Sequence, residues 1–221
     1  MSIKVIQSQP KGYVLFTSSQ NWTVPIGVSN IKIIVIGGGG GGGGGSASYA
    51  GGGGSGAVSY AEVQVDPGDV FSIQVGAGGS AGTGGSSPTA GGNGGTTQVL
   101  DPNGNIMVKA LQGGGGQPGG ASAAGAGGVG AESAGIGWSP QTNRVLYALS
   151  YAGNNGISGN GTTPGGFAFT PTLFPPGFAI SSNTLQASYN VPAAGYGAIG
   201  GQPNGNGVAG GNGAVIIWWD D

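Results

Sequence analysis

The sequence predicts an all-β protein: an antiparallel, jelly-roll-like β-sandwich that carries a bundle of glycine-rich polyproline-II helices and an aromatic, proline-rich loop insertion. Three observations predict it. Glycine supplies 56 of the 221 residues and comes in uninterrupted runs. Short segments rich in β-branched residues alternate with those runs. No stretch repeats apolar residues at helical spacing for more than a few residues, and no heptads are present.

The two ends of the chain are expected to close the core. Residues 31–36 are β-branched almost throughout, which is typical of a strand buried on both faces. Residues 214–219 form a second apolar segment of similar strength. We expect these ends to pair, so that residues 1–36 and 205–221 supply the closing strands of a single domain that spans residues 1–221.

Two hairpins are expected inside the glycine-rich region 37–137. The first joins residues 57–65 to residues 70–75 through an Asp-Pro-Gly-Asp turn, in which Pro presets φ and Gly accepts a positive φ. The second joins residues 96–100 to residues 106–111 through an Asp-Pro-Asn-Gly-Asn connection.

The glycine runs themselves need a stabilising partner. Ordering a residue costs roughly 1–2 kcal/mol, and glycine loses the most backbone entropy. Collagen is excluded because glycine does not recur at every third position and proline numbers only 13. Polyproline-II helices that bond to one another would offset the cost, and the alternative is that the runs are flexible linkers. The runs expected to form the bundle are 37–45, 76–95, 113–130 and 200–213.

An aromatic and proline-rich insertion occupies residues 138–199, where only residues 144–151 look regular, as a strand or a helical turn. Aromatic faces flanked by Asn and Ser donors can hold sugars or protein ligands. The alternative is that these rings form a second core or a subunit interface, since exposing all of them would be unfavourable. The candidates for a receptor-binding or interface role are Trp138, Tyr147, Tyr151, Phe167, Phe169, Phe174 and Tyr189.

Catalysis, cofactors and metals are not expected. The chain has neither His nor Cys, so the usual nucleophile–base pairs and thiolate ligands are missing. Asp66 and Asp69 are more simply explained as residues that form a turn than as a catalytic carboxylate pair. Asp101 is likewise more simply explained as a turn residue than as a ligand of a calcium ion. The strand–glycine junction near residue 37 lacks the helix that a dinucleotide site requires. Five dispersed cations do not form a patch for nucleic acid.

The charge is low for a protein of this length. Charged residues make up 5% of the chain and the net charge is −2. Such a chain is expected either to pack into an assembly or to present a neutral, hydrated surface. Without His, its stability is expected to change little between pH 5 and 9. Residues 1–10 contain no apolar region of the secretory type.

The order and spacing of these segments resemble the glycine-rich domain of phage tail proteins. The resemblance covers roughly residues 16–115 and 205–219. It is carried by Phe16, Trp22, Pro25, Gly27 and Val28, then by the segments 31–45, 51–57, 65–68, 73–79 and 91–96, and by the closing segment 210–218.

The resemblance implies a β-sandwich with polyglycine-II strands and a place in the virion tail, outside the cell. Tail-fibre tip adhesins use such a bundle to hold receptor-binding loops. The implied partners are other tail proteins, a host surface receptor of glycan or membrane-protein type, and further copies of the chain, with no nucleic acid. A self-assembling extracellular filament or surface-layer subunit is the alternative, and a carbohydrate-active enzyme is a third possibility.

Overall fold

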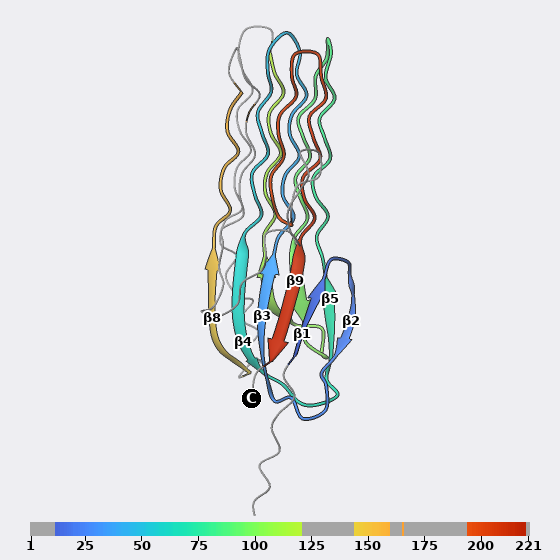
Figure 1. The fold of residues 1–221 in the computed structure, drawn as a ribbon, viewed down its shortest axis with the longest axis vertical. Coiled ribbons are helices and arrows are strands. Elements are labelled where there is room, and N and C mark those ends of the chain that lie inside the picture. Colours follow the sequence, from blue (N-terminus) through green and yellow to red (C-terminus); the bar gives the residue numbers. More distant parts are fainter. Residues whose placement is uncertain (1–11, 121–143, 160–164, 166–193, 220–221) are drawn as a thin grey trace, which may run out of the picture.

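The computed structural model describes residues 12–120, 144–159, 165 and 194–219, and the regular structure of these residues is entirely β-strand (Figure 1). None of them forms a helix that could cross a membrane. The strands build two antiparallel sheets, one of order β1-β9-β3-β4-β8 and one of order β2-β5-β6-β7. The all-β prediction is therefore confirmed. The strands are β1 (Gly12–Phe16), β2 (Gln20–Thr23), β3 (Asn30–Ile36), β4 (Val58–Gln64), β5 (Val70–Gln74), β6 (Thr97–Leu100), β7 (Ile106–Ala110), β8 (Val145–Tyr151) and β9 (Ala214–Trp219).

An apolar core lies between the two sheets in a sandwich-like arrangement. Strand β3 contributes to it through Ile33 and Val35, which pack with residues of both sheets such as Phe71 and Val99. The alternate residues of β3, Ile34 and Ile36, belong to a second buried cluster on the other face of the five-stranded sheet. The expectation that this strand is buried on both faces is confirmed.

Strand β9 is an interior strand of the five-stranded sheet, next to the edge strand β1. It pairs with β1 on one side, where Phe16 faces Val215, and with β3 on the other, where Ile36 faces Ala214. The predicted pairing of the two ends of the chain is therefore confirmed. Burial of β9 from Ala214 to Trp218 follows from this interior position.

The first predicted hairpin is wrong. Strand β4 pairs with β3 and β8, whereas β5 pairs with β2 and β6, so the two strands belong to opposite sheets. The turn between them forms as expected, with Gly68 at φ 90° and the Asp69 N–H donating to the Asp66 carbonyl at 3.0 Å. Val24 bonds to this turn through both its N–H and its carbonyl, which helps to hold the crossover between sheets. The second hairpin, between β6 and β7, is confirmed.

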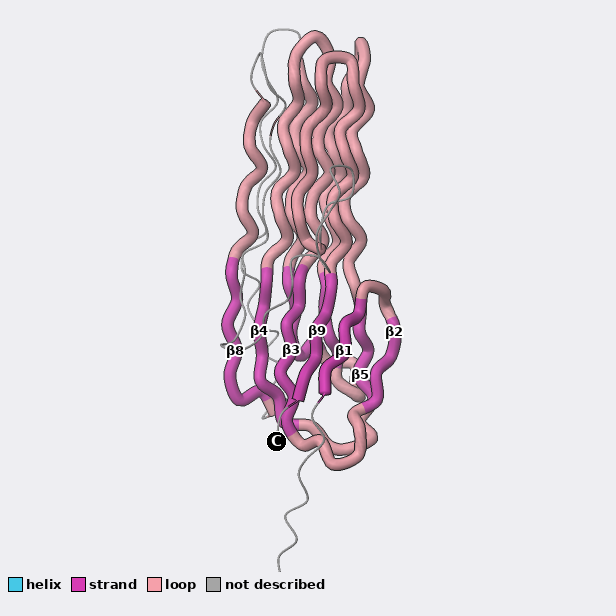
Figure 2. Tube along the Cα trace, in the orientation of Figure 1, coloured by secondary structure: helices cyan, strands magenta, loops and turns pink. Residues whose placement is uncertain are grey.

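Strands of both sheets continue without interruption into glycine-rich segments that run side by side away from the sheets (Figures 1 and 2). We call these segments the glycine array. Segments that run away from the sheets, here called ascending, follow β3, β5, β7 and β8, and segment 195–201 runs in the same direction; descending segments lead into β4, β6 and β9. The described array consists of segments 37–45, 50–57, 76–85, 89–95, 111–119, 153–158, 195–201 and 205–213.

Segment 37–45 is the centre of the array and bonds to six neighbours. Every third residue faces the same neighbour. The N–H groups donate to the three descending segments and the carbonyls accept from three ascending ones, 76–85, 111–119 and 195–201. Gly37, Gly40 and Gly43 donate to segment 50–57, Gly38, Gly41 and Gly44 to segment 89–95, and Gly39, Gly42 and Gly45 to segment 205–213, with N···O distances of 2.9–3.0 Å.

Close packing explains why the central run contains only glycine. A Cβ atom built on any of its nine residues would lie 1.8–2.2 Å from a backbone carbonyl oxygen of a neighbouring segment. These clashes repeat with the same period, so that every third glycine would meet the same neighbouring segment. No side chain fits anywhere along this segment.

The predicted glycine runs are found in the array with two differences and one gap. Residues 200–213 are not one run, because the connection 202–204 separates residues 200–201 from segment 205–213. Residues 76–95 are not one run, because the chain reverses near residues 86–88 and returns as a separate antiparallel segment. Residues 121–130 lie outside the described residues.

Candidate functional site

The far end of the glycine array, away from the sheets, gathers three short connections between segments (Figure 1). They comprise residues 46–49, 86–88 and 202–204, and we call this surface the tip. The tip is joined by backbone hydrogen bonds: the Asn204 N–H donates to the Ser46 carbonyl at 2.6 Å, and the Gly85 N–H donates to the Gly45 carbonyl at 2.9 Å. Asn204 turns the chain at φ 59°.

The side chains of the tip are uncharged, and seven of the ten are polar. They are Ser46, Ser48, Tyr49, Ser86, Ser87, Gln202 and Asn204, with Ala47, Pro88 and Pro203. The Ser46 hydroxyl is buried and has no hydrogen-bond partner among the described residues. Such a hydroxyl is a place where a water or a ligand hydroxyl can bond.

Charged residues are segregated from the tip. Those that the structure describes lie in the strands of the sheets or beside them, and the described part of the array contains none. The tip can therefore recognise a ligand by neutral hydrogen bonds and by shape, without ion pairing.

Strand β8 carries the two predicted site residues that the structure describes. It is the edge strand of the five-stranded sheet, and Tyr147 is 52% and Tyr151 44% exposed. The Tyr147 ring stands edge-on to Tyr60 at 6.1 Å between centroids, and Tyr60 in turn contacts the Trp218 ring at 5.9 Å. The other predicted candidates, Trp138, Phe167, Phe169, Phe174 and Tyr189, lie outside the described residues.

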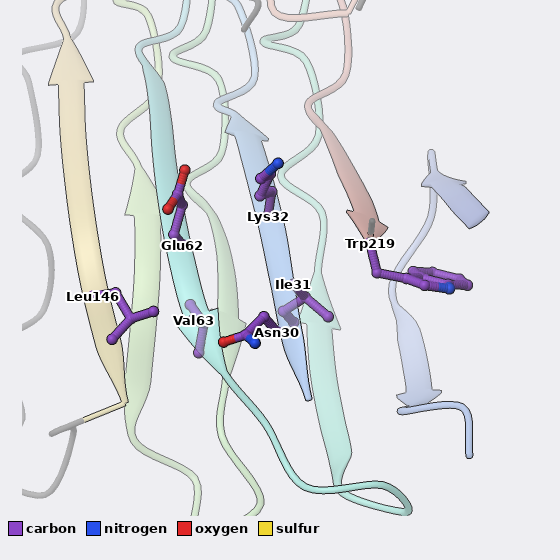
Figure 3. Close-up of a pocket in the computed structure, with 7 residues that line it drawn as sticks. All are labelled: Asn30, Ile31, Lys32, Glu62, Val63, Leu146 and Trp219. Atoms are coloured by element: carbon purple, nitrogen blue, oxygen red, sulfur yellow. The ribbon is translucent and has the colours of Figure 1, made fainter. Parts of the chain in front are cut away.

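A small pocket of about 180 Å³ opens where β3, β4 and β8 begin or end near Trp219 (Figure 3). Lys32 and Glu62, which face each other across β3 and β4, are its charged members. The Glu62 carboxylate accepts a hydrogen bond from the Tyr60 hydroxyl at 2.5 Å. This bond engages one oxygen of Glu62, which is the only carboxylate among the described residues that line the pocket.

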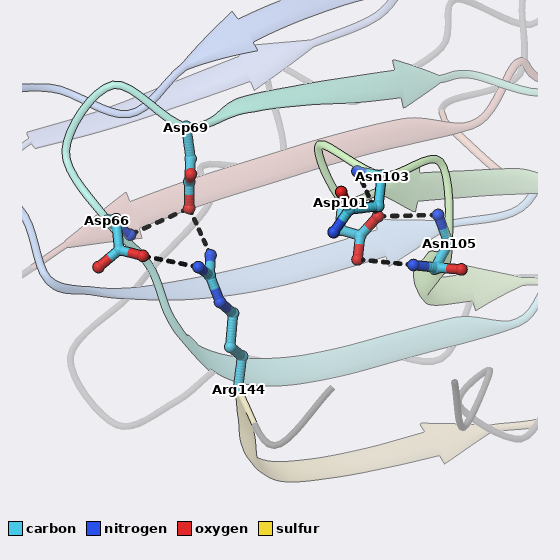
Figure 4. A network of polar contacts seen from close by, with 6 residues as sticks. All are labelled: Asp66, Asp69, Asp101, Asn103, Asn105 and Arg144. Carbon is cyan, nitrogen blue, oxygen red and sulfur yellow. Dashed lines mark hydrogen bonds and ion pairs between the residues drawn. The ribbon is translucent and has the colours of Figure 1, made fainter. Parts of the chain in front are cut away.

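Two turns beside the sheets contain aspartates that make networks of polar contacts (Figure 4). The Arg144 guanidinium donates to Asp66 at 2.6 Å and also to Asp69. The hydrogen bond to Asp69 raises the pKa of Arg144 above its ordinary value. This arrangement ties the start of β8 to the turn between the two sheets.

The second turn is organised by Asp101. One carboxylate oxygen accepts the N–H groups of Asn103 and Asn105 at 2.9 and 2.8 Å, and the other accepts the Asn105 amide at 3.1 Å. Both oxygens therefore cap the β6–β7 turn. Among the described residues, no group of three or more acidic side chains could hold a metal ion.

Sequence reasoning missed the tip, because residues 46–49, 86–88 and 202–204 are far apart in the chain. The available signal was local: each interrupts a glycine run with polar residues and, in two cases, with proline. It also missed three asparagines inside the glycine runs whose side chains accept backbone N–H groups, namely Asn93, Asn206 and Asn212.

Comparison with known proteins gives one match. A family model described as a glycine-rich domain matches residues 15–220. The match takes in both sheets from β1 onward and the whole described array. A search of curated proteins found no match.

Proposed function

Since the chain belongs to the glycine-rich domain family, we propose that it is a structural and adhesive module without catalytic activity, a virion tail or tail-fibre component that contacts a host surface. The observation that carries the proposal is the neutral tip, held at the end of a fully hydrogen-bonded central segment. The sheets at the other end would attach the module to other virion proteins. Its place would be outside the cell.

The array acts, in this proposal, as a bundle of polyglycine-II helices. The support is the period of three in the hydrogen-bond partners of segment 37–45, because a polyproline-II helix has three residues per turn and no internal hydrogen bonds. At about 3.1 Å per residue, the nine residues of that segment would span roughly 28 Å. The bundle would thus hold the tip away from the sheets at a fixed distance.

The proposed ligand is a neutral surface group, in the first instance a glycan. Hydroxyl and amide side chains can pair with sugar hydroxyls, and the tip carries several of them next to prolines and one tyrosine. A charged ligand would find no opposite charge there. A membrane protein of the host could present the same neutral chemistry.

Binding of fluorescently labelled protein to a panel of bacterial strains, together with an array of neutral glycans, tests this proposal. Replacing Ser87 and Gln202 by arginine places bulk and charge on exposed positions of the tip. We expect binding to fall at least tenfold. Ile26→Arg is the matched control, since Ile26 is 90% exposed in a turn at the sheet end. Equal binding by both variants would contradict a role for the tip.

Self-assembly into a filament or surface layer is the second candidate, favoured by one observation. Strand β8 is an edge strand without any charged residue, and Leu146, Tyr147 and Tyr151 on it are 54%, 52% and 44% exposed. Edge strands of this kind join other chains unless charge or proline blocks them. Size-exclusion chromatography with light scattering separates the candidates: open-ended polymers that Leu146→Lys abolishes would favour the filament, and a discrete small species the adhesin.

A further inference from the structure

One flank of the glycine array, formed by segments 76–85 and 205–213, has outward N–H groups that are covered by side-chain amides. The Gly78 N–H donates to Asn212 Oδ1 and the Gly84 N–H to Asn206 Oδ1, both at 2.8 Å. In the interior, the corresponding N–H groups donate to backbone carbonyls of the next segment. The two asparagines therefore occupy positions that a further segment would occupy if the array were wider.

The boundary between segments 89–95 and 111–119, which we call the second seam, also has an asparagine side chain that accepts a backbone N–H group. Asn93 Oδ1 accepts the Gly115 N–H at 2.9 Å. Three residues further along segment 111–119 stands Pro118, opposite Ala90, and proline has no N–H to cover. Along this seam, each of these outward positions either has an acceptor or lacks a donor.

The covered positions on the first flank follow the period of the array. Asn206 and Asn212 are six residues apart, as are Gly84 and Gly78, and the two segments are antiparallel. The position between them pairs Ala81 with Ala209, which has no side-chain acceptor. The Ala81 N–H has no acceptor among the described residues, so one hydrogen bond is missing from this ladder of glycine–asparagine bonds.

We propose that Asn93, Asn206 and Asn212 close the array laterally and keep it from binding glycine segments of a second copy of the chain. An uncovered row of N–H groups is a template for another extended chain, as at the edge of a β-sheet. The second copy is the fitting partner because its own segments have the same period of three and lack Cβ atoms where segments touch. The described part of the array contains no charge that would oppose such contact.

The double variant Asn206→Gly/Asn212→Gly tests closure, since glycine removes the amides and leaves the flank open. We expect a molar mass above that of the wild type in light scattering, rising with protein concentration, and faster amide exchange at Gly78 and Gly84 in dilute solution. Asn204→Gly is the matched control, because Asn204 lies at the tip with φ 59° and its side chain accepts none of the described N–H groups of the array. A double variant with the wild-type mass at every concentration would overturn the proposal.

The variant Ala209→Asn tests the same geometry without removing a hydrogen bond. The new side-chain amide supplies the missing acceptor for the Ala81 N–H, so we expect the Ala81 amide to exchange more slowly and Tm to rise by about 2–4 °C. This measurement stands even where the double variant folds poorly. Unchanged exchange at Ala81 would show that the asparagines do not act as a ladder in register with the array.

Discussion

The replacement Gly41→Ala tests whether contact between backbones holds the array together. The new Cβ would lie 1.9 Å from the Ser80 carbonyl oxygen, whereas ordinary contacts begin near 3.4 Å. Segment 76–85 would have to move away from segment 37–45 by about 1.5 Å, which stretches hydrogen bonds of 2.8–2.9 Å beyond their range. Three such bonds join these segments, from Gly79, Gly82 and Gly85.

The cost follows from those three bonds and from overpacking. Each bond contributes about 0.5–1.5 kcal/mol, and overpacking costs about 1–3 kcal/mol. We expect the free energy of unfolding to fall by about 2.5–7.5 kcal/mol, a large part of the 5–15 kcal/mol typical of native proteins. Urea denaturation followed by tryptophan fluorescence measures it, since Trp22, Trp218 and Trp219 lie in or against the cores of the sheets.

The matched control is Gly205→Ala, at the margin of the array. There the nearest atom to a new Cβ is the Gln202 carbonyl oxygen at 3.3 Å, so little has to move. We expect a change within about 1 kcal/mol, of either sign. Equal stability of the Gly41 and Gly205 variants would refute the idea that close backbone contact requires glycine in the central segment.

Three further predictions concern the sheets. Ile34→Ala should lower the free energy of unfolding by about 2–5 kcal/mol in urea titrations, because Ile34 is fully buried in the second cluster, on the other face of the five-stranded sheet. A loss below 1 kcal/mol would contradict that burial. Asp101→Ala should cost about 1–3 kcal/mol by the same measurement, because the β6–β7 turn loses three hydrogen bonds, while Asp66→Ala, an exposed control, should cost less. The raised pKa of Arg144 stabilises the fold below the unfolded pKa of arginine and is lost only as pH rises through the higher folded value. Tm should therefore stay flat between pH 5 and 9, and a calorimetric shift of more than a few degrees in that range would contradict this.

Periodicity and local turn chemistry predicted much of the fold. The almost continuous β-branched run in residues 31–36 indicated burial on both faces, and the Asp-Pro-Asn-Gly connection indicated the β6–β7 hairpin. The Asp-Pro-Gly-Asp turn misled because a turn sets only the local direction of the chain. Strand β4 pairs with β3 and β8, which are distant in sequence, so the turn connects the two sheets and does not close a hairpin.

The sequence also predicted only part of the candidate site. Aromatic content singled out Tyr147 and Tyr151, which lie on an exposed edge strand. The polar connections of the tip each interrupt a glycine run, but nothing in the sequence shows that they meet, because their proximity depends on how many residues each glycine segment contains. The capping role of Asn206 likewise depends on its register with Gly84, 122 positions away in sequence.

The amino-acid sequence by itself determined that this protein is a β-structure with glycine segments that need partners, because unpaired glycine runs cannot offset their loss of entropy. It determined the charge-poor surface as well. Only the tertiary structure decided which segments pair, that segment 37–45 lies at the centre with six neighbours, and which loops meet at the tip. The physical reason is that glycine has no side chain to specify a partner, so the register of the array is inherited from the strands that lead into it.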